Sequence, residues 1–184
     1  SADVELKPAQ IWGDYILTDF DFPRSVLLPH CEAIAHMWEV TYYHRHLRPR
    51  VAQMLEELKH MGMKLGIISN TAAQYQVFDT LEEYGIRDYF RDVTLSSVTG
   101  YRKPDPNIFR IALRQVQSLP EECVYVGDTI SRDVIGSKRA GFAVSIQIAS
   151  RLTREKDQQL EKAPEADYLI DDIYDVASVV RSLL

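Results

Sequence analysis

Short apolar stretches alternate with longer amphipathic stretches along most of this chain, from about Arg48 to the C-terminus. The short stretches are rich in β-branched and aromatic residues and predict strands at 64–68, 93–96, 124–126, 144–148 and 168–170. Helical spacing of apolar residues between them predicts helices at 51–61, 75–84, 108–116, 134–141 and 176–184. This order predicts an α/β fold: a Rossmann-like parallel sheet with helices on both faces and right-handed crossovers.

Residues 1–47 do not share this alternation and carry helical patterns only. One helix is expected to begin at Pro8, and a second to run from about Pro29 to Leu47. Four histidines lie in or near the second helix: His30, His36, His44 and His46. Their spacing does not put three on one helical face, so we expect solvated or core-edge roles. We therefore divide the chain into a partial helical cap, 1–47, and a core, 48–184.

Composition and charge narrow the class of protein. With 184 residues, 46% of them hydrophobic, the chain can form one domain, or one domain with a small insert. The formal net charge of −6 argues against a nucleic-acid or membrane-surface partner, and no stretch is apolar enough to span a bilayer. Cys31 and Cys123 are expected to be reduced residues in or near the core, which indicates a cytoplasmic protein. The oligomeric state stays open.

Two carboxylates follow the apolar stretch Val124–Val126. Gly127 ends this predicted strand, and Asp128 and Asp133 lie on the loop and the first helical turn beyond it. Ligand sites of open parallel sheets lie beyond the carboxyl ends of the strands. Two carboxylates suit Mg²⁺, which binds oxygen ligands, keeps several waters and pairs with phosphate. The alternative is an ordinary helix start, because Asp is also a favoured capping residue.

Two further strand ends or loops carry polar side chains. Ser69 and Asn70 follow the strand at 64–68 and precede a helix, whose free N–H groups make this a phosphate site by geometry. Lys103 lies in a proline-flanked loop, where it can neutralise phosphate charge or stabilise a carboxylate. Taken separately, these residues could be a helix cap and a solvent-exposed lysine. Taken with the acidic pair, they predict a phosphoryl-transfer pocket.

The three segments resemble motifs II, III and IV of the haloacid dehalogenase-like hydrolase superfamily, in matching order. They read Ile67-Ile68-Ser69-Asn70, Gly100-Tyr101-Arg102-Lys103-Pro104-Asp105-Pro106 and Val126-Gly127-Asp128-Thr129 with Asp133 four residues later. By that resemblance Ser69 binds the transferring phosphoryl group and Lys103 holds phosphate and nucleophile. Asp128 would bind Mg²⁺ directly, and Asp133 directly or through water. Most members of the superfamily are Mg²⁺-dependent phosphatases of small phosphorylated metabolites, and others are dehalogenases or phosphomutases.

The family's first motif, which supplies the nucleophilic aspartate, has no clean counterpart. The only Asp-x-Asp is Asp19-Phe20-Asp21, which lacks the expected residues after it and a strong strand before it. We expect residues 1–47 to be the later part of a cap, with the nucleophile's strand upstream and absent. The chain as printed would then be inactive, since an acyl-phosphate intermediate needs that carboxylate. Asp19 is the alternative nucleophile.

Two other functions stay open at this point. One is a nucleophile-less relative that binds a phosphorylated ligand or a protein without turnover. The other is dehalogenation of a 2-haloacid, against which the Asp128 and Asp133 pair speaks, because dehalogenases of this superfamily need no Mg²⁺. The substrate is not defined by the sequence, although Tyr42, Tyr43 and Arg45 could face the site, as could Arg48.

Overall fold

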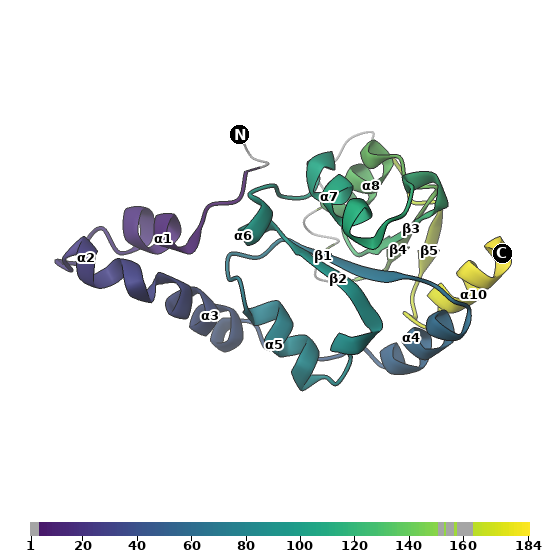
Figure 1. The fold of residues 1–184 in the computed structure, drawn as a ribbon, viewed down its shortest axis with the longest axis horizontal. Helices are drawn as coiled ribbons and strands as arrows, with labels where there is room; N and C mark the ends of the chain where they lie inside the picture. Colours follow the sequence, from purple (N-terminus) through teal and green to yellow (C-terminus); the bar gives the residue numbers. More distant parts are fainter. Residues whose placement is uncertain (1–3, 151–152, 154–156, 158–163) are drawn as a thin grey trace.

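The computed structural model describes residues 4–150, 153, 157 and 164–184 of the chain. Its helices and strands alternate as the sequence predicts, and Figure 1 shows a helical N-terminal part extending away from the strands. The predicted surface helix or loop at 153–164 falls mostly outside the described residues. Among the described residues, no helix combines the length and apolar character needed to cross a membrane.

All five predicted strands are present, and every pairing is parallel. They form two sheets instead of one: β1 (Leu65–Ser69) pairs with β2 (Phe90–Leu95), and β3 (Val124–Gly127), β4 (Val144–Ile148) and β5 (Tyr168–Ile170) pair in that order. The strand β2 begins three residues earlier than predicted, because its register continues to Phe90 opposite Leu65.

The helices of the core follow the predicted order. The longer ones are α4 (Val51–His60), α5 (Gln76–Glu83), α7 (Pro106–Val116), α8 (Ile135–Ala140) and α10 (Asp175–Leu183). Short helical turns lie between them, namely η3 (Arg87–Tyr89), α6 (Ser96–Thr99), η4 (Pro120–Glu122) and η5 (Ile130–Val134). The turn α6 was not predicted; it carries two serines whose side chains are fully buried and hydrogen-bonded.

Strand side chains alternate between two hydrophobic clusters, as the period of a strand requires. Ile67 of β1 and Val126 of β3 contact a cluster built from α4, α5, α10 and β4. Ile68 of β1 and Tyr125 of β3 belong instead to a cluster with α7 and α8. Both clusters therefore bridge the two sheets, and helices cover both faces, which confirms the predicted α/β class.

Among the described residues, β1 and β3 contribute to the same two hydrophobic clusters but do not pair with each other. In the described part of the chain, β1 is hydrogen-bonded only to β2, and β3 only to β4. Their apolar residues Ile67, Ile68, Val124 and Val126 are only half-buried, although central parallel strands are usually buried on both faces. One edge of each strand is therefore free for a further strand.

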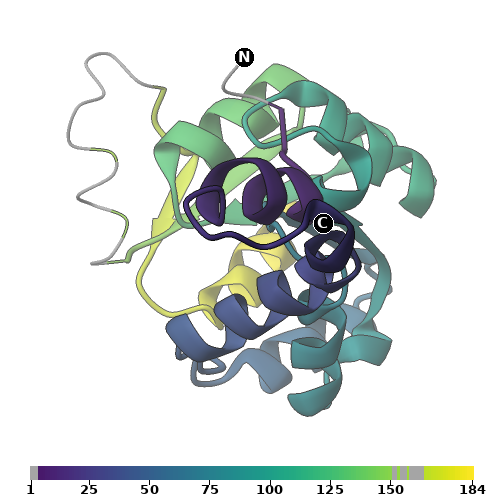
Figure 2. The same cartoon turned by 90° about the vertical axis from the view of Figure 1, so that its left-hand side faces the viewer.

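The N-terminal part is helical, as predicted. It comprises α1 (Pro8–Gln10), η1 (Ile11–Ile16), α2 (Arg24–Leu27), η2 (Leu28–His30) and α3 (Cys31–Tyr42), which Figure 2 shows in front of the rest of the chain. Its small core of Trp12, Cys31 and Ala35 includes Ala73 from the loop after β1. The N-terminal helices thus pack on the loop that follows Ser69.

The predicted second helix was too long, since α3 ends at Tyr42 and not at Leu47. Tyr43 is extended, with φ −98° and ψ 101°. The guanidinium of Arg45 then folds back and donates a 2.9 Å hydrogen bond to the carbonyl oxygen of Glu39. That bond satisfies one of the carbonyls that a helix C-terminus leaves open, so the chain leaves the helix at this point.

Candidate active site

Lys103 forms a buried ion pair with Asp133 at the carboxyl end of β3. The Lys103 Nζ lies 2.7 Å from Oδ1 of Asp133, and the two side chains are 13% and 5% exposed. The hydroxyl of Tyr125 donates to the same oxygen at 2.9 Å and lies 3.1 Å from the lysine. The structure therefore brings together two of the predicted site residues and adds a tyrosine that no sequence pattern marks.

The second carboxylate oxygen of Asp133 is also fully engaged. It accepts hydrogen bonds from the backbone N–H and the hydroxyl of Thr129, at 3.0 and 2.5 Å. Burial alone would raise the pKa of Asp133, but the charge of Lys103 and these hydrogen bonds outweigh it and hold the pKa below its usual value. Burial, reinforced by the charge of Asp133, raises the pKa of Tyr125 well above its usual value. Asp133 is thus an anion and Tyr125 a neutral donor.

Two glycines make room for this arrangement. A Cβ at Gly127 would lie 2.4 Å from Cβ and Cγ of Asp133, so only glycine lets this carboxylate fold back over the end of β3. A Cβ at Gly136 would lie 2.4 Å from the Phe109 ring and 3.2 Å from Cα of Pro104. Gly136 thereby lets α8 pack against α7 and the loop that carries Lys103.

Asn70 joins the loop after β1 to the loop that carries Lys103. Its Oδ1 accepts a 2.8 Å hydrogen bond from the backbone N–H of Lys103, and its Nδ2 donates to the carbonyl oxygen of Lys103 at 3.1 Å. The side-chain amide of Asn70 is therefore used to position the lysine. Within the described residues the Ser69 hydroxyl makes no side-chain hydrogen bond, so it is available at this strand end to receive an anion.

A buried carboxylate outside the predicted site supports both loops. One guanidinium nitrogen of Arg102 lies 2.6 Å from each of the two carboxylate oxygens of Glu5. The Ser96 hydroxyl donates a further 2.6 Å hydrogen bond to this carboxylate. Ser96 in turn accepts from the backbone N–H of Thr71 at 2.9 Å. Glu5 thus ties the start of the chain to the residues beside Lys103 and Asn70, and no local sequence pattern marks it.

The Asp128 side chain suits a metal ion better than Asp133 does. It is half-buried, and within the described residues no group donates a hydrogen bond to its carboxylate. Both oxygens of Asp133 are already occupied, so Asp133 could reach a cation only through water. One available carboxylate, waters and a phosphate oxygen are a donor set that Mg²⁺ accepts.

Asp157 occupies the N–H groups at the start of η5. Its two carboxylate oxygens accept from the backbone N–H groups of Ile130 and Ser131, at 2.8 and 3.0 Å. These are the orphan donors that a helix start leaves open. They are therefore not available to a substrate.

Asp19 is not brought to this site. It lies exposed in the turn between η1 and α2, and Figure 1 places that turn among the N-terminal helices, away from the strand ends.

Of the four histidines, His36 lies 2.9 Å from the Asp79 carboxylate. Among the described residues, no three His, Cys, Asp or Glu side chains form a group suited to a metal.

Comparison with known proteins identifies the family. The model of the haloacid dehalogenase-like hydrolases matches residues 24–146, which is more than half of the chain. The chain belongs to the haloacid dehalogenase-like hydrolase family. The match includes the Ser69, Lys103 and Asp128 segments, as the sequence motifs predicted. For this hydrolase, the matched region also contains the helical segment from Arg24 onward.

Two curated relatives of this haloacid dehalogenase-like hydrolase are phosphatases by name. The glyceraldehyde 3-phosphate phosphatase of Methanopyrus kandleri is 36% identical over 138 residues, which cover 73% of this chain and 57% of that protein. The protein of the same name from Pyrococcus furiosus is 29% identical over 171 residues, covering 91% and 68%. A solved HAD phosphatase from Thermococcus onnurineus has a TM-score of 0.63 and 26% identity, covering 88% of this chain and 66% of that one.

Proposed function

We propose that this chain carries most of the active site of a Mg²⁺-dependent phosphatase of small phosphorylated metabolites. The observation that carries the proposal is the junction of three strand ends around Lys103. The Asn70 side chain holds the lysine backbone, and Asp133 holds its ammonium group. A fixed, partly buried lysine beside a serine hydroxyl is suited to a phosphoryl group, whose transfer depends on positioning and charge neutralisation.

Each group has one role in this proposal. The Ser69 hydroxyl and the backbone N–H of Asn70 bind the oxygens of the phosphoryl group. Lys103 neutralises part of its charge, and Asp133 fixes the position of the lysine ammonium group through their 2.7 Å ion pair. Asp128 holds Mg²⁺ directly and Asp133 acts on it through water. When bound, Mg²⁺ supplies further positive charge to the phosphoryl oxygens.

The nucleophile is proposed to come from a strand between β1 and β3. Each of these strands has a free edge in the described part of the chain, and Lys103 lies at their carboxyl ends. A parallel strand inserted there would pair with both edges and bury Ile67, Ile68 and Val126. A carboxylate at the end of that strand would emerge beside Lys103. The 184-residue chain alone would then bind phosphate without turnover.

A second function has one observation in its favour. Asp133 is the carboxylate in contact with Lys103, and its oxygens are occupied by four donors. A carboxylate held in this way is a poor nucleophile, because attack would break its hydrogen bonds. A protein that binds a phosphorylated ligand or a protein partner without hydrolysis would keep this arrangement.

The free thiols and the net charge bear on the compartment and the class of partner that we propose. Cys31 and Cys123 are both free thiols, which fits the reducing cytoplasm that we propose for this protein. The net charge of −6 gives no support for a nucleic-acid partner or an anionic membrane surface. We therefore propose small phosphorylated metabolites as substrates. The glyceraldehyde 3-phosphate named for two relatives is one such compound.

The proposal is tested by Mg²⁺-dependent hydrolysis of an aryl phosphate, with Lys103→Ala as the control for contaminating phosphatase. No turnover by the folded chain, together with Mg²⁺-dependent phosphate binding, is the expected result. Turnover that Lys103→Ala abolishes would place a nucleophile within these residues, and Asp19→Asn would then be assayed first. Absence of phosphate binding would contradict the proposal altogether.

A further inference from the structure

A cavity of about 270 Å³ opens beside the proposed phosphate site. The residues that line it come from the segment after α3, the end of β1 and the helix α5, and are Arg45, Leu47, Ser69, Asn70, Thr71, Gln76, Val77, Thr80, Leu81, Tyr84 and Ile86. Because Ser69 and Asn70 belong to this lining, the cavity is continuous with the groups proposed to hold phosphate. Pockets for drug-sized ligands usually have volumes of about 300–1,000 Å³. This cavity is slightly smaller, so its volume suits a small metabolite.

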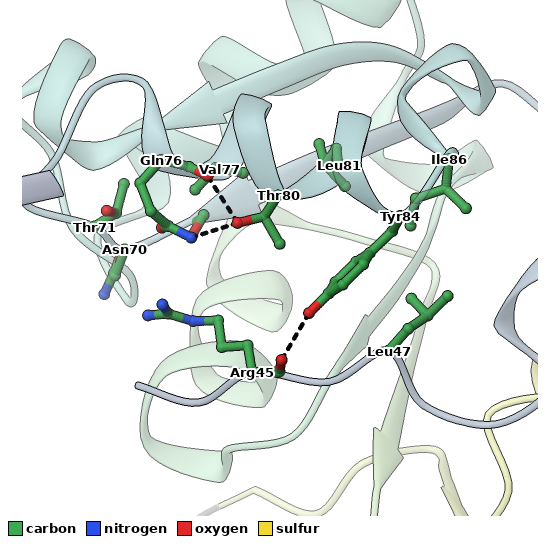
Figure 3. Close-up of a pocket in the computed structure, with 11 residues that line it drawn as sticks. Arg45, Leu47, Asn70, Thr71, Gln76, Val77, Thr80, Leu81, Tyr84 and Ile86 are labelled. Atoms are coloured by element: carbon green, nitrogen blue, oxygen red, sulfur yellow. Dashed lines mark hydrogen bonds between the residues drawn. The ribbon is translucent and has the colours of Figure 1, made fainter. Parts of the chain in front are cut away.

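Arg45 is the charged residue among the described residues that line this cavity. Figure 3 shows its guanidinium extended toward Asn70, across the cavity from α5. The cavity wall therefore carries one fixed positive charge close to the end of β1. An anionic group of a ligand in the cavity would be attracted to that charge in competition with the Glu39 carboxylate, with which Arg45 forms an ion pair.

Contacts with Glu39, Tyr43 and Tyr84 hold Arg45 in position. Its two terminal nitrogens donate to the carbonyl oxygen and the carboxylate of Glu39, at 2.9 and 2.5 Å. Its guanidinium also lies over the ring of Tyr43, 4.7 Å from the centroid, and its own carbonyl oxygen accepts from the Tyr84 hydroxyl at 2.9 Å. A guanidinium has five N–H donors, so donors remain for a second anion.

The opposite wall is formed by α5 and is electrically neutral. The side-chain amide nitrogen of Gln76 donates a 2.7 Å hydrogen bond to the Thr80 hydroxyl. That hydroxyl donates in turn to the backbone carbonyl oxygen of Gln76 at 2.9 Å, as Figure 3 shows. Val77 and Leu81 continue the wall with apolar surface. This wall can contact a short carbon chain but offers no second charge, so recognition of an anion falls to Arg45.

We infer that Arg45 determines substrate specificity by binding a second anionic group, a carboxylate or another phosphate, of the phosphorylated substrate. The inference rests on the proposed function, because it places the substrate's phosphoryl group at Ser69 and Asn70. The rest of the molecule extends through the cavity to the guanidinium. Arginine forms charge-assisted, often bidentate hydrogen bonds with carboxylate and phosphate, which makes it suited to this task.

Two matched probes test the inference by calorimetry in the presence of Mg²⁺. Phosphoglycolate and ethyl phosphate have the same phosphate ester, but phosphoglycolate has a carboxylate where ethyl phosphate has a methyl group. The wild-type chain is expected to bind phosphoglycolate at least tenfold more tightly. Arg45→Gln is expected to bind both probes equally, with affinity for ethyl phosphate within twofold of wild type. Arg48→Gln, an exposed arginine outside the lining, keeps the preference.

Two outcomes would overturn the inference alone: equal affinity of the wild-type chain for both probes, or a preference that survives in Arg45→Gln. Binding of neither probe would overturn the proposed function and this inference with it.

Glu39→Gln is the second variant, because it removes the anion that competes for Arg45. It is expected to strengthen phosphoglycolate binding several-fold without affecting ethyl phosphate. An unchanged preference in this variant would count against Arg45 even if Arg45→Gln fails to fold.

Discussion

The side chain of Asn70 holds both backbone polar groups of Lys103, accepting from its N–H at 2.8 Å and donating to its carbonyl oxygen at 3.1 Å. These residues are 33 positions apart in the chain and belong to two loops at the carboxyl end of the strands. The contact fixes where the lysine side chain starts, and Asp133 fixes where it ends. The proposed site is therefore built on a lysine that is held at both ends.

The first prediction concerns this contact. Asn70→Asp replaces the donor to the Lys103 carbonyl with an acceptor, which leaves a half-buried backbone oxygen unsatisfied and adds repulsion. We expect a loss of about 1–3 kcal/mol in the free energy of unfolding and phosphate binding at least tenfold weaker. Urea unfolding and calorimetry measure the two effects.

Asn107→Ala is the matched control for Asn70, since the Asn107 side chain makes a 3.3 Å contact with Arg110 near the surface. It should change stability by less than about 0.5 kcal/mol and leave phosphate binding intact. Normal phosphate affinity in Asn70→Asp would mean that the lysine does not depend on this contact.

The second prediction concerns the close approach of Asp133 to Gly127. A Cβ at Gly127 would lie 2.4 Å from atoms of the Asp133 side chain, so Gly127→Ala must displace that carboxylate. We expect a destabilisation of about 1–3 kcal/mol and loss of Mg²⁺-dependent phosphate binding, as measured by thermal unfolding and calorimetry.

Gly66→Ala is the control for this substitution, because the nearest atom to its added Cβ is a methyl carbon of Val116 at 3.3 Å. This side chain can shift by a few tenths of an ångström. Gly66→Ala should therefore keep phosphate binding. Equal behaviour of the two alanine variants would show that Asp133 does not need the space at Gly127.

Several features of this fold and site could be predicted from the sequence. The α/β order and the roles of the β1 and β3 ends follow from local patterns, because carboxyl ends of parallel strands share one edge of a sheet. The sequence predicts Ser69 and Asp128 at this edge on that basis, and Lys103 in a neighbouring proline-flanked loop. The pairing of β1 with β2 and of β3 with β4 could not be predicted from local periodicity, because it joins segments that are distant in the sequence.

Other features depend on contacts between distant residues and gave no local signal. Glu5 contacts Ser96 and Arg102, 91 and 97 positions away, and its neighbours in sequence do not distinguish it from a surface glutamate. The end of α3 at Tyr42 depends on Arg45 folding back onto Glu39, which a helical pattern cannot reveal. Tertiary hydrogen bonds decide both cases.

The third prediction concerns Glu5. Glu5→Ala removes the partner of Arg102 and of the fully buried Ser96 hydroxyl, so both lose hydrogen bonds. We expect a destabilisation of about 1–3 kcal/mol together with weaker phosphate binding, because one of the links between the loops of Thr71 and Lys103 is lost while the Asn70 contact remains. Chemical unfolding and phosphate titration measure these effects.

Glu83→Ala, an exposed position at the end of α5, is the control for Glu5. Glu5→Gln adds a finer test, since an amide keeps one acceptor oxygen and loses the charge. It should give an intermediate loss of stability. Wild-type stability in Glu5→Ala would remove the proposed role of this carboxylate as a support of the site.

The fourth prediction concerns pH and Asp167. Hydrogen bonds from the Ser145 backbone and hydroxyl, assisted by Lys138, lower the pKa of Asp167 from 3.8 to about 2. Since the folded-state pKa is the lower one, this stabilisation is present above about pH 4 and is lost as pH falls toward about 2. The stability difference between wild type and Asp167→Asn should therefore narrow over that range in thermal unfolding experiments.

Asp171→Asn, an exposed aspartate in the same part of the chain, should show no such narrowing. A difference between wild type and Asp167→Asn that stays constant from pH 6 to about pH 2 would contradict the link between this carboxylate and the start of β4.

Ser69, Lys103 and Asp128 are proposed to form one phosphate and metal site, and calorimetric titration of inorganic phosphate into the 184-residue chain decides whether they do. With Mg²⁺ present, the wild-type chain should bind phosphate at least tenfold more tightly than it does without the metal. Lys103→Met should abolish binding, and Asp128→Asn should abolish its dependence on Mg²⁺. Phosphate binding that is absent, or equal in all three proteins, would show that these residues do not form such a site.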